Sequence, residues 1–218
     1  MKRMSFFAVL TLFLAVPVCG QDYAAEDHHY GFHFGAAYSN FQDDKLEIEI
    51  IEPDDIITFY LGGSLFFYEI FALEVSVSYA KESVYEVASG AAVNYGDFTQ
   101  FPISVSAKLY NNPEGGKVRA FLAAGMSYYF LDFDQSQYLT NIYSDVYGVT
   151  GKVKVENELS PFFAIGIDIF ISHNAAISSQ IKYTWLNPRV TLPIPMIWDE
   201  HLKVNPFTIS LGFSLYGG

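Results

Sequence analysis

Cysteine, tryptophan and basic residues are all scarce in this 218-residue chain. It has one cysteine and two tryptophans, and its 12 Lys and Arg residues are outnumbered by 24 Asp and Glu residues. A single cysteine excludes a disulfide framework within the chain. So acidic a chain also lacks the clustered positive charge that binding to nucleic-acid phosphates requires. We therefore expect neither internal disulfides nor a nucleic-acid partner.

Long apolar runs are scarce too, and the one that exists lies at the N-terminus. Lys2 and Arg3 precede an apolar run over residues 6–18, which ends just before Gly20. A basic start followed by a short apolar run is typical of a secretory signal, and the run is too short to cross a membrane as a helix. We predict that residues 1–20 are a signal peptide cleaved after Gly20.

The alternative for this N-terminus is a lipoprotein in which Cys19 carries the lipid, and Val16 and Val18 fit a lipoprotein signal poorly. After the N-terminal run, no stretch of 18 or more uncharged apolar residues occurs. A second membrane-spanning helix is therefore excluded.

Aromatic residues are abundant, with 20 Phe and 16 Tyr, and such residues favour strands. Apolar residues also alternate with small or polar ones along much of the chain. Near the C-terminus, for example, one face would carry Phe207, Ile209, Leu211, Phe213 and Leu215, and the other Thr208, Ser210, Gly212 and Ser214. Alternation with a period of two residues indicates strands with a different environment on each face.

Eight segments have this alternation: 30–39, 56–67, 71–81, 100–110, 117–131, 160–171, 176–186 and 205–216. The connections alternate between long (40–55, 82–99, 132–159 and 187–204) and short (68–70, 111–116 and 172–175). An even number of long antiparallel strands, with short turns at one end and long loops at the other, is typical of a bacterial outer-membrane barrel.

We therefore predict an all-β fold, a transmembrane, eight-stranded, antiparallel, up-and-down β-barrel over residues 30–218, with residues 21–29 as a periplasmic segment before it. The alternative is a secreted sandwich or lipocalin-like barrel whose apolar face points inward. The polar faces disfavour that alternative, because they consist mainly of Ser, Gly, Ala and Thr. A sheet facing water would carry more Lys, Glu and Arg.

Charged residues on the small-residue face are predicted to gather at one level of the barrel. If the short turns are periplasmic, five of them lie within a few residues of that end: His33, Glu74, Lys108, Arg119 and Asp168. Charges at one level of so narrow a lumen would be costly if they were unpaired. We predict that these five residues form a salt-bridge and hydrogen-bond network, a floor that closes the lumen at its periplasmic end.

Above this predicted floor most inward residues are small, and Tyr60, Tyr129 and Phe162 are larger exceptions that we take as candidates for a ligand path. Two interpretations stay open. The small residues leave a cavity open to the outside, or a few aromatic side chains fold inward and fill it.

The last long loop contains apolar residues where an exposed polar loop would be expected. They are Leu192, Ile194, Met196 and Trp198, within "VTLPIPMIWDE". Exposed apolar surface usually binds something, which predicts a hydrophobic mouth that collects a ligand. The alternative is that this segment continues a strand above the membrane or packs across the lumen as a plug.

Five sequence blocks follow one another in order: "FPISVSAKLYNN", "VRAFLAAGMSYYFLDF", "SPFFAIGIDIFI", "ISSQIKYTWL" and "NPFTISLGFSLY". In this order they resemble successive blocks of the outer membrane protein W (OmpW) family, with Arg119 and Gly125 in the second block and Gly166 and Asp168 in the third. The resemblance implies a narrow barrel that admits small hydrophobic molecules from outside and is closed at its periplasmic end, so that the molecules leave laterally into the membrane. The C-terminus departs from the family, which usually ends on Phe.

The sequence thus predicts passive uptake of small hydrophobic molecules, and a structural or surface-interaction barrel without transport is the alternative. The expected partners are outer-membrane lipid and lipopolysaccharide, small hydrophobic ligands and the barrel assembly machinery. We expect no enzyme, because His201 is the only histidine on the predicted outer side and no serine is evidently paired with it. No cofactor or metal is expected, since neither a zinc motif nor EF-hand spacing occurs.

Overall fold

The computed structural model describes residues 28–40, 56–68, 70–88, 91–111, 117–193, 199–201 and 204–218. The predicted signal peptide over residues 1–20 lies outside these ranges. No helix in the described part of the chain is long and apolar enough to cross a membrane.

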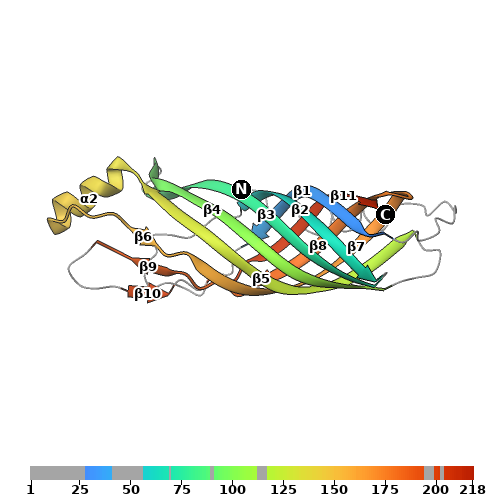
Figure 1. Ribbon diagram of the computed structural model, residues 1–218. Coiled ribbons are helices and arrows are strands. Elements are labelled where there is room, and N and C mark those ends of the chain that lie inside the picture. The colour runs from blue at the N-terminus through green and yellow to red at the C-terminus, as the bar shows by residue number, and fades with distance from the viewer. Residues whose placement is uncertain are drawn as a thin grey trace.

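Eight antiparallel strands close into a barrel (Figure 1). They are β1 (Tyr30–Asn40), β2 (Ile56–Tyr68), β3 (Phe71–Ala88), β4 (Ala91–Tyr110), β5 (Val118–Gln135), β7 (Glu158–Ser172), β8 (Ala175–Thr184) and β11 (Phe207–Gly217). Each strand pairs with its neighbours in the sequence of barrel strands, and β11 pairs with β1 from Tyr30 opposite Gly217 to Asn40 opposite Phe207. The predicted eight-stranded antiparallel barrel is confirmed.

The outer wall of the barrel is apolar and the inner wall is not. Side chains along β5 alternate strictly between exposed and buried over most of its length. Outward aromatic and aliphatic side chains are among the most exposed in the molecule, with Phe59 at 70%, Ile57 at 65% and Leu65 at 61%. Inward Ser127 and Ser160, in contrast, are fully buried. A continuous apolar outer wall suits lipid rather than water.

The two ends of the barrel differ. One end, here called the turn end, has the start of β1, the end of β11 and the short connections, such as His173–Asn174 between β7 and β8. The opposite end, the loop end, carries α2 (Gln137–Tyr147), β6 (Lys154–Val155), β9 (Arg189–Thr191) and β10 (Asp199–His201) (Figure 1). Strands β3, β4 and β5 extend furthest toward α2.

The predicted long loop over residues 82–99 is wrong. Strands β3 and β4 continue through it as a paired hairpin, from Ala80 opposite Gln100 to Ala88 opposite Ala91. The strand-forming residues Val84, Tyr85 and Val93 supply the reason, since they support pairing beyond the expected end of the lipid-spanning part. The Ser-Gly dipeptide at residues 89–90 is typical of turns and indicates a hairpin at this point in the sequence.

The predicted loops over 132–159 and 187–204 also contain regular structure. Helix α2 begins after Ser136, whose hydroxyl accepts a hydrogen bond from the Leu139 amide at 3.2 Å, and ends at Gly148 in the left-handed conformation. Strands β6, β9 and β10 form a small antiparallel sheet of their own. Leu139 and Tyr143 of α2 are buried, so the helix packs its apolar face against the loop end.

Large inward side chains occupy spaces left by glycines on neighbouring strands. A Cβ atom at Gly125 would lie 2.8 Å from the ring of Phe162, and one at Gly166 would overlap the ring of Phe121. Tyr60 on β2 leans over the neighbouring strand β1 in the same way, so that its hydroxyl would lie 2.8 Å from a Cβ atom at Gly35. Of the two open interpretations of the lumen, aromatic filling therefore accounts for part of the space.

The close contacts that a Cβ atom would make at these glycines lead to a stability prediction. Gly125→Ala should lower the free energy of unfolding by about 1–3 kcal/mol, because the new methyl group overlaps the Val105 carbonyl and meets the Phe162 ring. Gly63→Ala is the matched control, since the nearest atom to its Cβ position is the Gly31 carbonyl oxygen at 3.7 Å. Urea titration of the refolded protein in lipid vesicles measures both. Equal stability of the two variants would contradict the packing described here.

Candidate functional site

The turn-end level of the lumen contains a buried ion pair between neighbouring strands. Arg119 on β5 lies directly opposite Asp168 on β7, and the Arg119 Nη2 atom is 3.5 Å from Asp168 Oδ2. Asp168, only 2% exposed, also accepts hydrogen bonds from the hydroxyls of Ser178 at 2.7 Å and Tyr216 at 2.6 Å. The carboxylate thus accepts two hydrogen bonds from hydroxyls and faces the guanidinium charge. Together these interactions compensate for its removal from water.

A second buried group of charges lies across the lumen from Asp168. The Lys108 ammonium on β4 is 2.5 Å from Glu74 on β3, and His33 Nε2 on β1 is 3.4 Å from the same carboxylate oxygen. The two ring nitrogens of His33 also make hydrogen bonds, to Ser214 at 2.7 Å and to Ser64 at 2.9 Å. His33 is therefore held on three sides by polar groups from three other strands.

Two serines join these groups into one network. The hydroxyls of Ser178 and Ser214 are hydrogen-bonded to each other, so a continuous chain of contacts runs from His33 to Asp168. We call the whole set the floor network: His33, Ser64, Glu74, Lys108, Arg119, Asp168, Ser178, Ser214 and Tyr216. Every one of the eight barrel strands contributes at least one of these residues. Two carboxylates and two cations balance within it.

An aromatic layer surrounds the Arg119 guanidinium. Its central carbon lies 4.2 Å from the ring centre of Tyr110 and between 4.9 and 5.2 Å from three other rings. Those rings belong to Tyr216, Phe66 and Phe170, which all stand near strand ends at the turn end. Cation–π contacts and close packing therefore fill the space around the ion pair.

The structure brings together the five residues predicted for the floor, but the prediction omitted several partners. Tyr216 is the most informative omission, because its even number places it on the same face as Ser210, Gly212 and Ser214. The period-two pattern was therefore sufficient to find it. The serines carried no separate signal, since Ser is the ordinary residue of this face along every strand.

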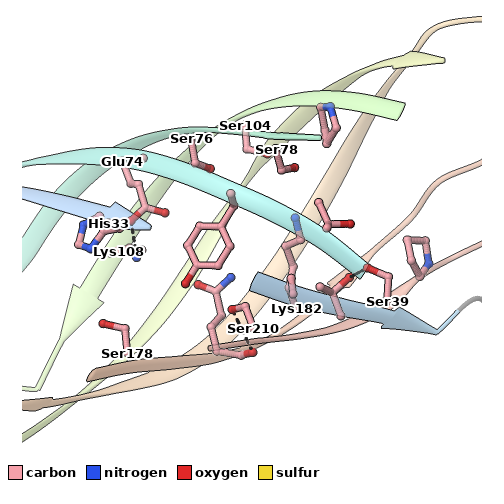
Figure 2. Close-up of a pocket in the computed structure, with 18 of the residues that line it drawn as sticks. His33, Ser39, Glu74, Ser76, Ser78, Ser104, Lys108, Ser178, Lys182 and Ser210 are labelled. Carbon is pink, nitrogen blue, oxygen red and sulfur yellow. Dashed lines mark hydrogen bonds and ion pairs between the residues drawn. The ribbon is translucent and has the colours of Figure 1, made fainter. Parts of the chain in front are cut away.

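Above the floor network lies a cavity of about 100 Å³ (Figure 2). Its wall is mostly polar, with hydroxyl and amide groups from several strands: Ser39, Thr58, Ser104, Gln180, Thr208 and Ser210. Tyr60 and Tyr129, two of the predicted path residues, line it as well. Phe162, the third, points inward over Gly125 and packs beside Lys182, whose Nζ atom is 5.1 Å from the ring centre.

Toward the loop end apolar side chains predominate in the interior, beside the buried amides Gln100 and Gln135. A first cluster, the upper cluster, consists of Ile56, Ala80, Tyr129, Leu131, Leu186 and Val204. A second, the outer cluster, consists of Val84, Tyr95, Phe133, Leu139, Tyr143 and Val153. Phe98 and Val155 pack against both, so apolar side chains are continuous from α2 down to the top of the cavity.

The barrel wall has an interrupted ladder at the height of the upper cluster. Pairing between β3 and β4 runs up to Val77 opposite Ile103 and resumes at Ala80 opposite Gln100. Between these pairs, Ser78 and Tyr79 of β3 face Pro102 and Phe101 of β4. Because proline has no amide proton, it cannot donate to the neighbouring strand. The β3–β4 ladder therefore lacks the hydrogen bond that an amide at residue 102 would donate.

The predicted hydrophobic mouth is described only in part. Leu192 is partly buried and packs against the outer cluster. Ile194, Met196 and Trp198 lie outside the described residues. The strands on either side of them, β9 and β10, pair with each other from Arg189 opposite His201 to Thr191 opposite Asp199.

Comparison with known proteins agrees with this architecture. The OmpW family model matches residues 37–216, which is most of the chain. The chain belongs to the OmpW family. The family resemblance expected from the sequence blocks is thereby confirmed, and the protein is an outer-membrane β-barrel of the OmpW type.

Among individual relatives, a Rickettsia bellii (strain RML369-C) protein named as an outer membrane protein is 22% identical over 168 residues. That alignment covers 70% of this chain and 61% of the relative. This chain thus spans less than two thirds of the relative's length.

Solved structures share the fold. OprG from Pseudomonas aeruginosa has a TM-score of 0.67 at 13% identity, covering 90% of this chain and 99% of its own. AlkL in lipid bilayers has a TM-score of 0.61 at 12% identity, covering 93% and 95%. OmpW of E. coli has a TM-score of 0.54 at 11% identity, covering 88% and 99%. At these identities the likeness shows the fold alone.

The floor network makes a second stability prediction. Arg119→Met should lower the free energy of unfolding by about 3–5 kcal/mol, because it leaves Asp168 as a buried charge without its cation. The double variant with Asp168→Asn should recover part of that loss. Lys81→Met is the control, since Lys81 and Asp97 form an exposed pair at 2.8 Å that should contribute little.

Urea unfolding in vesicles of the wild type, Arg119→Met, Asp168→Asn and their double variant gives the coupling between Arg119 and Asp168. Additive effects of the two single substitutions would show that the pair does not act as a unit.

Proposed function

We propose that this OmpW-family barrel admits small hydrophobic molecules from the cell exterior and releases them sideways into the outer membrane. The observation that carries the proposal is the continuous apolar interior that ends beside the interrupted ladder at Pro102. No catalytic step is part of the proposal.

A lateral route is favoured because the straight route through the lumen is unsuitable for an apolar solute. Below the upper cluster the wall is polar, and below the cavity the floor network and its aromatic layer occupy the cross-section. An apolar molecule in contact with these charges and hydroxyls would displace water from them and would offer no hydrogen bond in return. Such a solute should therefore leave the lumen above the cavity.

The upper cluster and the interrupted ladder lie at the same height. Tyr129 belongs to the cluster and stands directly opposite Pro102 on the neighbouring strand. Ala80, another member, follows Tyr79, which pairs with Phe59 on β2 but lies within the β3–β4 interruption. A solute in contact with the upper cluster would thus need to part only β3 and β4, where the ladder is already interrupted, to reach lipid.

At the loop end, the outer cluster would receive the solute. Helix α2 buries Leu139 and Tyr143 in this cluster, while Tyr138 and Tyr147 remain about half exposed. We propose that Leu192, together with Ile194, Met196 and Trp198, adds to this apolar entrance. The role of that segment as a mouth remains a proposal.

A structural or surface-interaction barrel is the second candidate, and the aromatic filling of the lumen favours it. Tyr60, Phe121 and Phe162 each occupy the space above a glycine, which leaves little free volume for a passing molecule. If the upper cluster does not open, the barrel carries no solute, and its loops serve only for contacts at the cell surface. The two candidates differ in whether the protein carries solute.

Pro102→Val tests the lateral route. Valine supplies the missing amide proton and should complete the ladder, so uptake of an apolar solute should fall by about threefold or more. Pro161→Val is the matched control, because Pro161 lies at the end of the β7–β8 ladder, which begins at Phe162 opposite Thr184, and away from the β3–β4 interruption. Uptake of N-phenylnaphthylamine is measured by fluorescence in vesicles with a lipopolysaccharide outer leaflet, which restricts passage through lipid alone.

Absence of uptake above protein-free vesicles would reject transport and support the structural candidate. Equal uptake by wild type and Pro102→Val, with transport present, would instead reject only the lateral route. Correct folding of both variants is checked by their heat-dependent mobility on gels.

A further inference from the structure

We propose that the polar cavity binds a short-chain monocarboxylate, with Lys182 as its counter-ion. This site is separate from the apolar route above it and does not depend on uptake of hydrophobic molecules.

Lys182 lies on the inward face of β8 and lines the cavity. Within the described residues it makes no ion pair and no hydrogen bond, and its recorded contact is with the ring of Phe162, 5.1 Å from the ammonium nitrogen. Lys108, the other inward lysine, is by contrast 2.5 Å from Glu74. A cation away from bulk water is costly unless a negative group compensates it.

Glu74 attracts the Lys182 ammonium through space, but its carboxylate is in contact with Lys108 instead. Glu74 and Asp168 are matched by Lys108 and Arg119 within the floor network. Among the charges of the floor network and the cavity wall, with His33 counted as neutral, Lys182 is one positive charge in excess, and the inward carboxylates Glu82 and Glu158 lie nearer the loop end. The cavity therefore favours an anion, and a monoanion rather than a dianion.

Hydrogen-bond donors stand on the same side of the cavity as Lys182. Thr208 lies directly opposite Lys182 on β11, and its hydroxyl is 2.8 Å from that of Ser39 on β1. Ser210 and Gln180 occupy the next pair toward the floor. Figure 2 shows Lys182 apart from His33, Glu74 and Lys108, on the side where Ser39 lies. One ammonium with neighbouring hydroxyls is the donor set that a carboxylate requires.

The remaining wall fits a short alkyl chain. Ala37, Pro102, Phe121 and Tyr129 also line the cavity and give it apolar patches. A volume of about 100 Å³ accommodates a few heavy atoms but not a long acyl chain. Acetate, propionate and butyrate combine one carboxylate with an apolar tail of this size, whereas a fatty acid exceeds it.

Butyrate titration of the isotopically labelled protein in lipid nanodiscs tests the site. The backbone amide resonances of Thr208 and Ser210 and the side-chain resonance of Lys182 should shift saturably at millimolar butyrate. Butanol, which has the same tail but no charge, should bind about tenfold more weakly or not at all. Stearate should not compete.

Lys182→Met removes the charge and should weaken butyrate binding by about tenfold or more, whereas Lys182→Arg should retain it within a few-fold. Lys152→Met is the matched control, because Lys152 is exposed on the segment between α2 and β6 and should leave binding unchanged. The amides of Thr208 and Ser210 report on every variant, including those that lack the Lys182 resonance.

The site is rejected if wild type gives no saturable shift up to about 100 mM butyrate, or if butanol binds equally. Unchanged binding by Lys182→Met would also reject it. Should Lys182→Met fail to fold, the comparison of butyrate with butanol on the wild type still decides. Because the readout is equilibrium binding, its outcome is independent of the uptake experiment with Pro102→Val.

Discussion

The floor network is the constraint on which the lumen depends. It places buried charges from separate strands at one level, and these charges are tolerable only while every partner stays in register. A shift of one residue on any strand would turn its floor residue toward lipid. Asp168 shows the point most clearly, since it is bound from three different strands by Arg119, Ser178 and Tyr216. The network therefore fixes the register of the barrel.

Once the floor is fixed, the interior divides into layers of different polarity. Charges and aromatic rings occupy the turn end, hydroxyls and amides surround the cavity, and aliphatic and aromatic residues fill the loop end. The inward positions of β5 pass through these layers from Arg119 through Ser127 to Leu131 and Phe133. One strand thus supplies each layer simply by changing the side chain at alternate positions.

The alternation along the strands was enough to predict the barrel and the meeting of Arg119 with Asp168, because a two-residue period leaves little freedom in which side chains face inward. It did not predict the β3–β4 hairpin above Ala80 or helix α2. Beyond the lipid, neither face must be apolar, so the pattern that marked the strands disappears there. The ladder interruption at Pro102 was hidden for a different reason. Its effect depends on which residue lies opposite, and register is a property of the folded barrel.

The layers also explain how two proposed solutes would be kept apart. An apolar molecule gains by contact with the upper cluster but loses by entering the hydroxyl-lined cavity, where it would displace hydration without replacing it. A short carboxylate would gain there from the ammonium of Lys182, which makes no ion pair within the described residues. The boundary between the two environments lies at Tyr129, which belongs to the upper cluster and lines the cavity. Polarity of the wall, rather than its width, would therefore decide which molecule stays and which one leaves through the interrupted ladder.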